Sequence, residues 1–325
     1  MKSPDFFVFG VERSGTTLLS FLLGSQPGIF VLNDSFIYDM FIKSQAVKVG
    51  SGMLQLYRWV GKRIRPFSKL VRSIRKEPYL LRSVQNLQAD TVITYKEARR
   101  FHDLLGAGLG SLRSEQTSPT GESWIAVYRT HLDLGQIAEH SGSIALVDLL
   151  NGTYDQIAKA YANNDTVIYG EKTPIHTYYA EWIVPFYQTR KIILILRNPI
   201  TNIASLYKRN YQDLNLAIRI YQRYIPNLLW ISKLPVVHVI KYEDLILNPK
   251  ATLRDAVNYL DKNLVFDATL PLIPYIKGEY VGNLIDKSRD NALMNLLNTA
   301  QKEKVLKECQ PIFQQFYPSE IGETV

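Results

Sequence analysis

Short apolar runs alternate with amphipathic stretches along most of the chain. Five runs are bounded by glycine, proline or polar residues, as buried strands are, and they cover residues 6–10, 29–32, 166–169, 191–196 and 236–240. Helical patterns occupy 17–23, 199–211, 214–233, 249–261 and 291–316. Strands that alternate with helices form parallel sheets covered on both faces. We therefore predict an α/β fold with a P-loop-like central parallel sheet flanked by helices.

Residues 36–165 depart from this alternation. They are rich in helical patterning, with a polar stretch at 106–121 that predicts a loop and a second helical stretch at 137–163. No linker rich in Pro, Gly or Ser separates them from the rest of the chain. The sequence therefore predicts one domain over 1–325, with a helical basic insertion, or lid, at about 36–165.

The positive charge of the chain is concentrated in this insertion. The chain has 325 residues and a net charge of +8, and its 46% of hydrophobic residues is typical of a globular protein. Eleven of the 38 Lys and Arg residues lie between Lys43 and Arg82, with a single acid, Glu77. Basic residues interleaved with Trp and Leu could lie on an anionic membrane surface, could line the site of an acidic acceptor, or could simply form a solvated helix face. No nucleic-acid-binding motif accompanies them, so nucleic acid is not an expected partner.

The cysteine content and the apolar segments of the chain bear on its location in the cell. The one cysteine, Cys309, allows no internal disulfide and gives no cysteine cluster for a metal. No apolar run approaches the roughly 20 residues that span a bilayer, and the N-terminus lacks the pattern of a signal peptide. These features favour a cytoplasmic protein, either free or peripheral to a membrane.

A tight polar loop follows the first predicted strand. Gly10-Val11-Glu12-Arg13-Ser14-Gly15-Thr16-Thr17 lies between a strand and a helix, the context of a phosphate-binding loop. Backbone N–H groups at a helix N-terminus attract anions, Gly15 allows a close approach of the backbone, and Thr16 and Thr17 add hydroxyl donors. Nucleoside-triphosphatase loops carry Lys where this chain has Thr16, and Arg13 supplies a cation instead. The loop therefore predicts an anion site that differs from those of ATPases and GTPases.

This loop resembles the 5′-phosphosulfate loop of the sulfotransferase superfamily. The likeness rests on Arg-Ser-Gly-Thr-Thr-Leu-Leu at residues 13–19 and is nearer to the tyrosylprotein, heparan and bacterial carbohydrate branches than to the small-phenol branch. It implies that the sulfuryl donor is 3′-phosphoadenosine 5′-phosphosulfate (PAPS), used as a co-substrate. It also implies that Arg13, Ser14, Gly15, Thr16 and Thr17 bind that donor.

A second motif ends the strand at 191–196. Arg197 follows the strand, and Ser205 and Arg209 come eight and twelve residues later, spacings that keep all three on roughly one face. A hydroxyl between two guanidinium groups suits a phosphate monoester. The family's Arg–(eight)–Ser pair binds the donor's 3′-phosphate, with a further Arg in some branches, and the resemblance implies this role for Arg197, Ser205 and Arg209.

Two further segments are similar to family signatures. Lys241-Tyr242-Glu243-Asp244-Leu245 resembles the (R/K)YEDL segment, which implies that Tyr242 contacts the donor nucleotide; its acids would also suit the first turn of a helix. Residues 277–289 are the counterpart of the family's C-terminal lid over the nucleotide, in which Lys287 is the expected basic contact.

Transfer of a sulfuryl group needs a base for the acceptor and cations for the leaving phosphate. Sulfuryl transfer resembles phosphoryl transfer in relying on positioning and electrostatics, and no metal is expected if Lys and Arg supply the charge. The segment at 170–174 resembles the family's GEKTP motif, which implies that Lys172 stabilises the transition state. Asp34 is the candidate base, at a place where the family usually has Glu. Asp34, Lys172 and Arg13 are thus the predicted catalytic residues.

Several alternatives remain open from the sequence. Glu171 and His176 are the other candidate bases, and Asp34 would also suit the cap of a helix. The whole protein could instead be a P-loop kinase or NTPase, or a non-catalytic protein that keeps the nucleotide pocket and binds an anionic partner. The acceptor hydroxyl could belong to a carbohydrate, a tyrosine, a lipid or another small molecule.

Overall fold

A five-stranded parallel sheet forms the centre of the protein. The computed structural model describes residues 2–49, 84–111, 142–187, 190–209, 213–270, 275–276, 279–280 and 287–321. The sheet has the order β2-β5-β1-β6-β7, and every neighbouring pair is parallel. Its strands are β1 (Phe6–Phe9), β2 (Ile29–Asn33), β5 (Ile168–Lys172), β6 (Lys191–Leu196) and β7 (Val237–Lys241). The predicted α/β architecture is confirmed.

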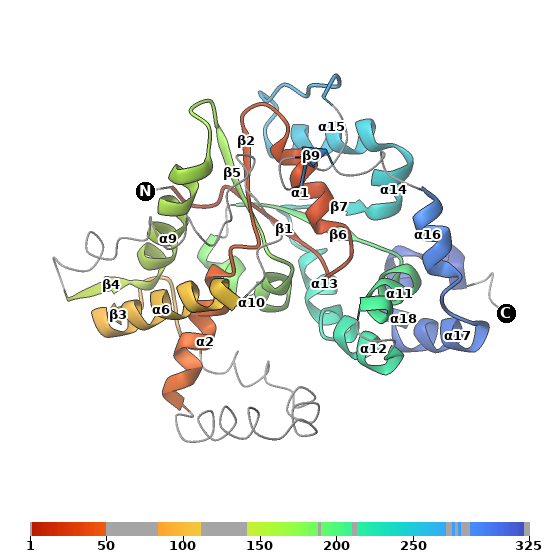
Figure 1. The fold of residues 1–325 in the computed structure, drawn as a ribbon, viewed down its shortest axis with the longest axis horizontal. Coiled ribbons are helices and arrows are strands. Elements are labelled where there is room, and N and C mark those ends of the chain that lie inside the picture. The colour runs from red at the N-terminus through yellow and green to blue at the C-terminus, as the bar shows by residue number, and fades with distance from the viewer. Residues whose placement is uncertain are drawn as a thin grey trace.

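Helices cover both faces of this sheet (Figure 1). One face packs on leucines and other apolar residues of three helices, α1 (Thr16–Gly24), α14 (Tyr242–Leu247) and α15 (Pro249–Leu260). The other face packs on a larger apolar cluster from α10 (Ala180–Ile183), α11 (Pro199–Arg209), α12 (Leu214–Gln222) and α13 (Ile225–Ile231), beside the short 3-10 helices at Pro174–Tyr179 and Val184–Tyr187. The inner strands β5, β1 and β6 are buried almost throughout, as in other parallel sheets, whereas the edge strand β7 is partly exposed.

The insertion contains helices and a small separate sheet. Its described elements are α2 (Ile37–Val49), β3 (Val92–Thr94), α6 (Tyr95–Ser111), β4 (Ser143–Ala145) and α9 (Leu146–Tyr161). β3 and β4 pair antiparallel, which the helical patterning does not predict. The loop predicted at 106–121 is wrong for its first residues, since α6 continues to Ser111, and the rest of that stretch lies outside the described residues. α2, α6 and α9 join the larger apolar cluster through residues such as Phe41, Phe101 and Tyr154.

The chain ends in a helical segment packed on α11. It comprises α16 (Lys287–Met294), α17 (Thr299–Glu308), α18 (Gln310–Phe316) and a 3-10 turn at Pro318–Ile321. The short strands β8 (Tyr275–Ile276) and β9 (Glu279–Tyr280) form an antiparallel pair before it. Asn298 begins α17 with a capping box, its side chain accepting from Gln301 N at 2.9 Å. In Figure 1 this segment lies beside α11 and α12.

A buried histidine between α6 and α9 makes the stability of the fold depend on pH. His102 Nε2 lies 3.2 Å from Thr153 Oγ1, and burial lowers the pKa of His102 to about 4. Between pH 7 and pH 5 the unfolded chain therefore takes up a proton that the folded chain does not. We expect the free energy of unfolding to fall by about 2 kcal/mol over this range, measured by urea denaturation at both pH values. His102→Gln should remove most of this loss, and an equal loss in that variant would contradict the assignment.

Candidate functional site

Residues singled out from the sequence lie at one edge of the central sheet. Asp34 follows β2, Lys172 ends β5, Arg197 follows β6 and Tyr242 follows β7, while the phosphate loop follows β1. All five are at the carboxyl ends of parallel strands. In open α/β sheets, ligands bind outside the carboxyl ends of the strands, at the point where the strand order reverses. The fold thus brings segments up to about 230 residues apart into one site.

The phosphate loop ends at a helix N-terminus that is suited to an anion. Gly15 precedes α1 with a φ of 97°, in the left-handed region that favours glycine. No side chain caps α1, and its first turn holds no acid. The buried Ser14 hydroxyl has no hydrogen-bond partner within the described residues. Free N–H groups, a helix dipole and a spare hydroxyl together fit an oxyanion such as a phosphate or phosphosulfate.

Lys172 links the loop to the candidate base. Its Nζ lies 2.9 Å from Asp34 Oδ1 and 3.2 Å from Thr17 Oγ1. The Lys172 side chain is 0% exposed, whereas the Asp34 side chain is 19% exposed. Asp34 is therefore partly open to solvent while it contacts the buried Lys172 side chain.

Arg13, Ser205 and Arg197 meet on the other side of the loop. Arg13 Nε donates to Ser205 Oγ at 3.2 Å, and Arg197 Nη1 donates to the Arg13 carbonyl oxygen at 2.9 Å. Arg197 is fixed further by Thr201, whose Oγ1 accepts from Arg197 Nε at 3.2 Å. Arg13 thus contacts the Ser205 hydroxyl through its guanidinium and the Arg197 guanidinium through its backbone carbonyl. Guanidinium and hydroxyl donors suit a phosphate monoester.

Tyr242 joins this cluster to the loop. The Arg197 guanidinium lies 4.3 Å from the centre of the Tyr242 ring, a cation–π contact. A Cβ atom at Gly15 would come within 2.4 Å of Tyr242 Cδ2, so the ring packs directly on the loop backbone.

Arg209, the third predicted phosphate ligand, is 61% exposed and pairs with Glu12 at 3.3 Å. It lies at the rim of the site rather than within the Arg13–Ser205 contact.

The residue after Arg197 is held by Glu243 and by the C-terminal segment, whose part the sequence does not predict. Glu243 Oε1 accepts from Asn198 N at 2.8 Å, and Glu243 Oε2 accepts from the Tyr317 hydroxyl at 3.1 Å. Burial raises the pKa of Glu243, while these two donors and Arg197 oppose the shift. Asn198 also donates to Glu320 through its side chain. Nothing in the local sequence marks Tyr317 or Glu320, because only the tertiary packing brings the C-terminal segment here.

The two alternative bases lie deeper than Asp34. Glu171 is 1% exposed and His176 0%, and Glu171 Oε2 lies 3.0 Å from His176 Nδ1. Glu171 thus pairs with a histidine beneath the surface, while the carboxylate that reaches Lys172 belongs to Asp34. Of the three candidates, Asp34 is the one that contacts Lys172 and is partly exposed.

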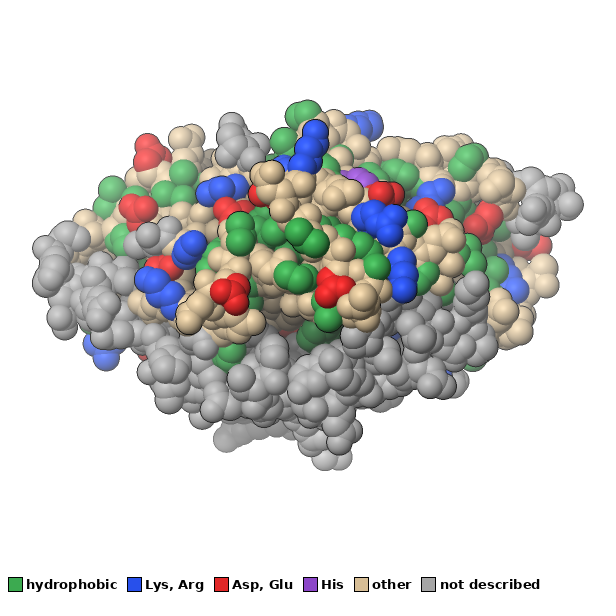
Figure 2. Space-filling model, turned by 90° about the horizontal axis from the view of Figure 1, so that it is seen from above, with side chains coloured by type: hydrophobic (Ala, Val, Ile, Leu, Met, Phe, Trp, Pro, Cys, Tyr) green, Lys and Arg blue, Asp and Glu red, His purple; other side chains and the backbone are tan. Residues whose placement is uncertain are grey.

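Some predicted features fall outside the described residues. These are most of the basic segment 43–82 and most of the predicted lid at 277–289. Lys287 begins α16, but its side chain is not among those described. Lys43 is described and pairs with Asp39 at 2.6 Å. Basic, acidic and hydrophobic side chains are interspersed on the described part of the face in Figure 2, with no broad area of one sign.

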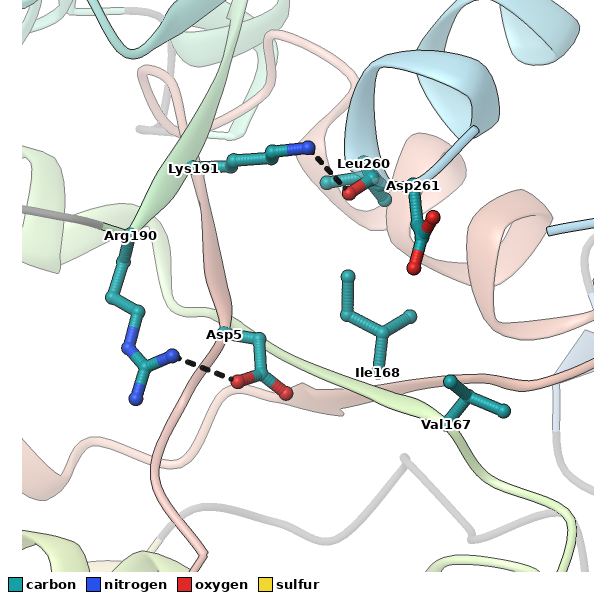
Figure 3. Close-up of a pocket in the computed structure, with 7 residues that line it drawn as sticks. All are labelled: Asp5, Val167, Ile168, Arg190, Lys191, Leu260 and Asp261. Atoms are coloured by element: carbon teal, nitrogen blue, oxygen red, sulfur yellow. Dashed lines mark hydrogen bonds and ion pairs between the residues drawn. The ribbon is translucent and has the colours of Figure 1, made fainter. Parts of the chain in front are cut away.

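A separate cavity of about 310 Å³ lies at the opposite, amino-terminal edge of the sheet (Figure 3). Its charged residues are already used in structural contacts: Arg190 Nη1 pairs with Asp5 at 3.1 Å, and Lys191 Nζ donates to the last carbonyls of α15 at 2.7 Å. It shares no residue with the site described above.

Within the described ranges, no group of three or more His, Cys, Asp or Glu is arranged to hold a metal, and no helix is long and apolar enough to cross a membrane.

The fold is similar to those of two solved sulfotransferase domains. The sulfotransferase domain of the curacin biosynthetic pathway is 14% identical with a TM-score of 0.51, over 95% of this chain and 99% of that one. The sulfotransferase domain of the Synechococcus PCC 7002 olefin synthase is 17% identical with a TM-score of 0.53, over 96% of this chain and 94% of that one. A search of curated proteins found no match. The sequence model of the Sulfotransferase family matches residues 4–265, so the chain belongs to the sulfotransferase family.

Proposed function

We propose that this sulfotransferase moves a sulfuryl group from PAPS to the hydroxyl group of an acceptor. The observation that carries the proposal is the hydrogen bond of 3.2 Å between Arg13 Nε and Ser205 Oγ. It joins the phosphate loop to the second motif, 192 residues away in the sequence. Two predicted anion-binding segments in contact fit a donor that carries phosphate groups at both the 3′ and the 5′ position of its ribose.

The residues divide into two groups that would bind the two ends of the donor. Ser14, Gly15, Thr16 and Thr17 would hold the 5′-phosphosulfate through the loop N–H groups and hydroxyls. The 3′-phosphate would be held by Arg197, Ser205 and Arg209, beside the ring of Tyr242. Arg13 contacts Ser205 and belongs to the loop, so it connects the two groups.

Asp34 and Lys172 have complementary roles in the transfer. Asp34 accepts the proton of the acceptor hydroxyl as its oxygen bonds to sulfur, and the bond from sulfur to the phosphate oxygen breaks. Protonation neutralises the Asp34 carboxylate, so the Lys172 ammonium at 2.9 Å is left to stabilise the charge on the departing phosphate. The products are the sulfated acceptor and 3′,5′-adenosine bisphosphate.

Calorimetry with 3′,5′-adenosine bisphosphate tests the donor site. We expect the product nucleotide to bind with micromolar or better affinity without a metal. Tight binding of Mg-ATP with no binding of the bisphosphate would instead favour a kinase or NTPase.

The contribution of Arg209 can be tested by removing its charge. Arg209→Met should weaken bisphosphate binding by about fivefold, since a charge-assisted hydrogen bond at an exposed position contributes on the order of 1 kcal/mol. Lys208→Met is the matched control, because Lys208 is an exposed cation on the same helix. Equal losses in the two variants would indicate a general effect of charge rather than a contact with the 3′-phosphate.

Turnover with labelled donor tests catalysis and the acceptor class. Carbohydrate, tyrosyl, lipid and other small-molecule fractions of a cell extract would each be incubated with radiolabelled PAPS. We expect label to be transferred to one fraction by the wild type, and to the same fraction at a measurable but much lower rate by Asp34→Asn. Bisphosphate binding without transfer to any fraction would favour a non-catalytic binding protein.

A further inference from the structure

The turn that carries Asp34 has an unusual backbone. Within the described residues, three non-glycine residues have a positive φ, namely Arg13 at 70°, Asp34 at 52° and Phe36 at 54°. All three lie in the phosphate loop or in the turn after β2. Asp tolerates this conformation because its short side chain can hydrogen-bond locally, but a bulky aromatic residue rarely adopts it. The surrounding contacts must therefore hold residues 34–36 in place.

Those contacts come from the end of β5 and the residue after it. Asp34 N donates to the Lys172 carbonyl oxygen at 2.6 Å, and Phe36 N donates to Thr173 Oγ1 at 3.4 Å. Between them, the Ser35 hydroxyl donates to Glu171 Oε1 at 2.8 Å. Each of the three residues of the turn is thus bonded to a different residue of the segment 171–173.

Glu171 is the centre of this arrangement. Its Oε1 accepts from Thr173 Oγ1 at 2.6 Å as well as from Ser35, and its Oε2 lies 3.0 Å from His176 Nδ1. Ser35, Thr173 and His176 are all fully buried. A buried carboxylate is costly unless its oxygens are hydrogen-bonded, and an apolar residue would fill the space at a lower cost. Both carboxylate oxygens of Glu171 have hydrogen-bond partners here, and one of them bonds Ser35, which gives Glu171 a role in holding the turn.

The geometry of the strand keeps this role separate from direct catalysis. Successive side chains of a strand point to opposite faces, so Glu171 and Lys172 leave β5 on different sides. Lys172 reaches Thr17 and the Asp34 carboxylate, whereas Glu171 reaches the hydroxyl of Ser35 and so the backbone of the turn. Glu171 therefore reaches Asp34 through the turn.

We propose that Glu171, Thr173 and Ser35 form a positioning unit, the turn clamp, that holds the Asp34 carboxylate against Lys172 for the transfer reaction. The inference rests on the proposed function, in which Asp34 is the base. The donor contacts of Arg13, Arg197 and Ser205 belong to other segments. Loss of the clamp therefore lowers kcat and leaves donor binding intact.

Thr173 offers the sharpest test, because a matched pair of variants exists. Thr173→Val keeps the shape of the side chain but removes the hydroxyl that bonds Phe36 N and Glu171, while Thr173→Ser keeps the hydroxyl. We expect Thr173→Val to lower kcat by about 10- to 100-fold, with the KM for PAPS and the Kd for the bisphosphate within about twofold of the wild type. Thr173→Ser should retain kcat within about threefold. Equal losses in the two variants would overturn the proposal.

A double variant distinguishes positioning of Asp34 from a general structural effect. If the clamp works through Asp34, Thr173→Val should cost no further activity in the Asp34→Asn background. A loss by the same factor in both backgrounds would show that the clamp does not act through Asp34, and the proposal would fail.

Hydrogen exchange gives a readout that does not depend on turnover. The amides of Asp34 and Phe36 should exchange faster in Thr173→Val than in the wild type, and those of Thr173→Ser should not. A wild-type chain that transfers no sulfuryl group would reject the proposed function by itself. The exchange comparison would still decide whether the clamp holds the turn, and unchanged protection in Thr173→Val would refute it.

Discussion

Replacement of Lys172 by methionine is expected to lower kcat for sulfuryl transfer by about a thousandfold. The Lys172 side chain is 0% exposed, and its Nζ is 2.9 Å from Asp34 and 3.2 Å from Thr17. A cation held in a buried site needs little reorganisation as charge develops on the leaving phosphate, and loss of one such group typically costs roughly 10²–10³ in rate. Loss of the ion pair with Asp34 adds to this effect. Steady-state kinetics with PAPS and an identified acceptor would measure it.

Lys191 provides a matched control for this variant. It begins β6 in the same sheet, but its Nζ donates to the carbonyls of Tyr259 and Leu260 at 2.7 Å, at the opposite edge (Figure 3). Lys191→Met should lower the free energy of unfolding by about 1–2 kcal/mol, because the C-terminus of α15 loses its cation. Its kcat should not change. If Lys172→Met turned over like Lys191→Met, Lys172 would not be the cation that stabilises the transition state.

Replacement of Gly15 by alanine is the second large effect that we expect. Gly15 has a φ of 97°, and an added Cβ would come within 2.4 Å of Tyr242 Cδ2. The backbone strain costs roughly 1–2 kcal/mol, and the Tyr242 ring must move away from the loop and from Arg197. We expect the affinity for 3′,5′-adenosine bisphosphate to fall by about 100-fold, about 2.7 kcal/mol, measured by calorimetry.

Gly24, at the end of α1, is the control for this substitution. A Cβ there would meet only Val31 atoms at 4.0 Å. Gly24→Ala should leave bisphosphate binding unchanged and stabilise the chain by about 0.5–1 kcal/mol, since alanine loses less backbone entropy in a helix. Wild-type affinity in Gly15→Ala would contradict the role assigned to the contact between the loop and Tyr242.

The strands show where sequence patterns are informative and where they are not. The strand predicted at 191–196 is observed at those residues, because all five of its buried residues are apolar and form one unbroken run. The strand predicted at 166–169 is observed at Ile168–Lys172. Its last two residues, Glu171 and Lys172, are charged and buried, so the apolar run ends before the strand does. The displaced boundary coincides with the functional site, where polar residues occupy positions that packing alone would fill with apolar ones.

The helices show a similar division. The pattern at 214–233 predicts one helix, but two are observed, α12 and α13, with Pro226 in the first turn of the second. Proline is compatible with a first turn and not with a helix interior, so it divides the pattern. The hydrophobic pattern predicts which positions are buried in both helices, but it does not predict the break in the backbone between them.

The sequence by itself determined the fold class and the family, and it placed the predicted site residues at the ends of strands. It could do so because short apolar strands and glycine-containing loops are local patterns. Tertiary structure alone decided that Arg13 meets Ser205, that Asp34 rather than Glu171 reaches Lys172, and that Tyr317 supports Glu243. These contacts join segments far apart in the sequence. They depend on strand order, side-chain direction and burial, and none of these is present in a local pattern of residues.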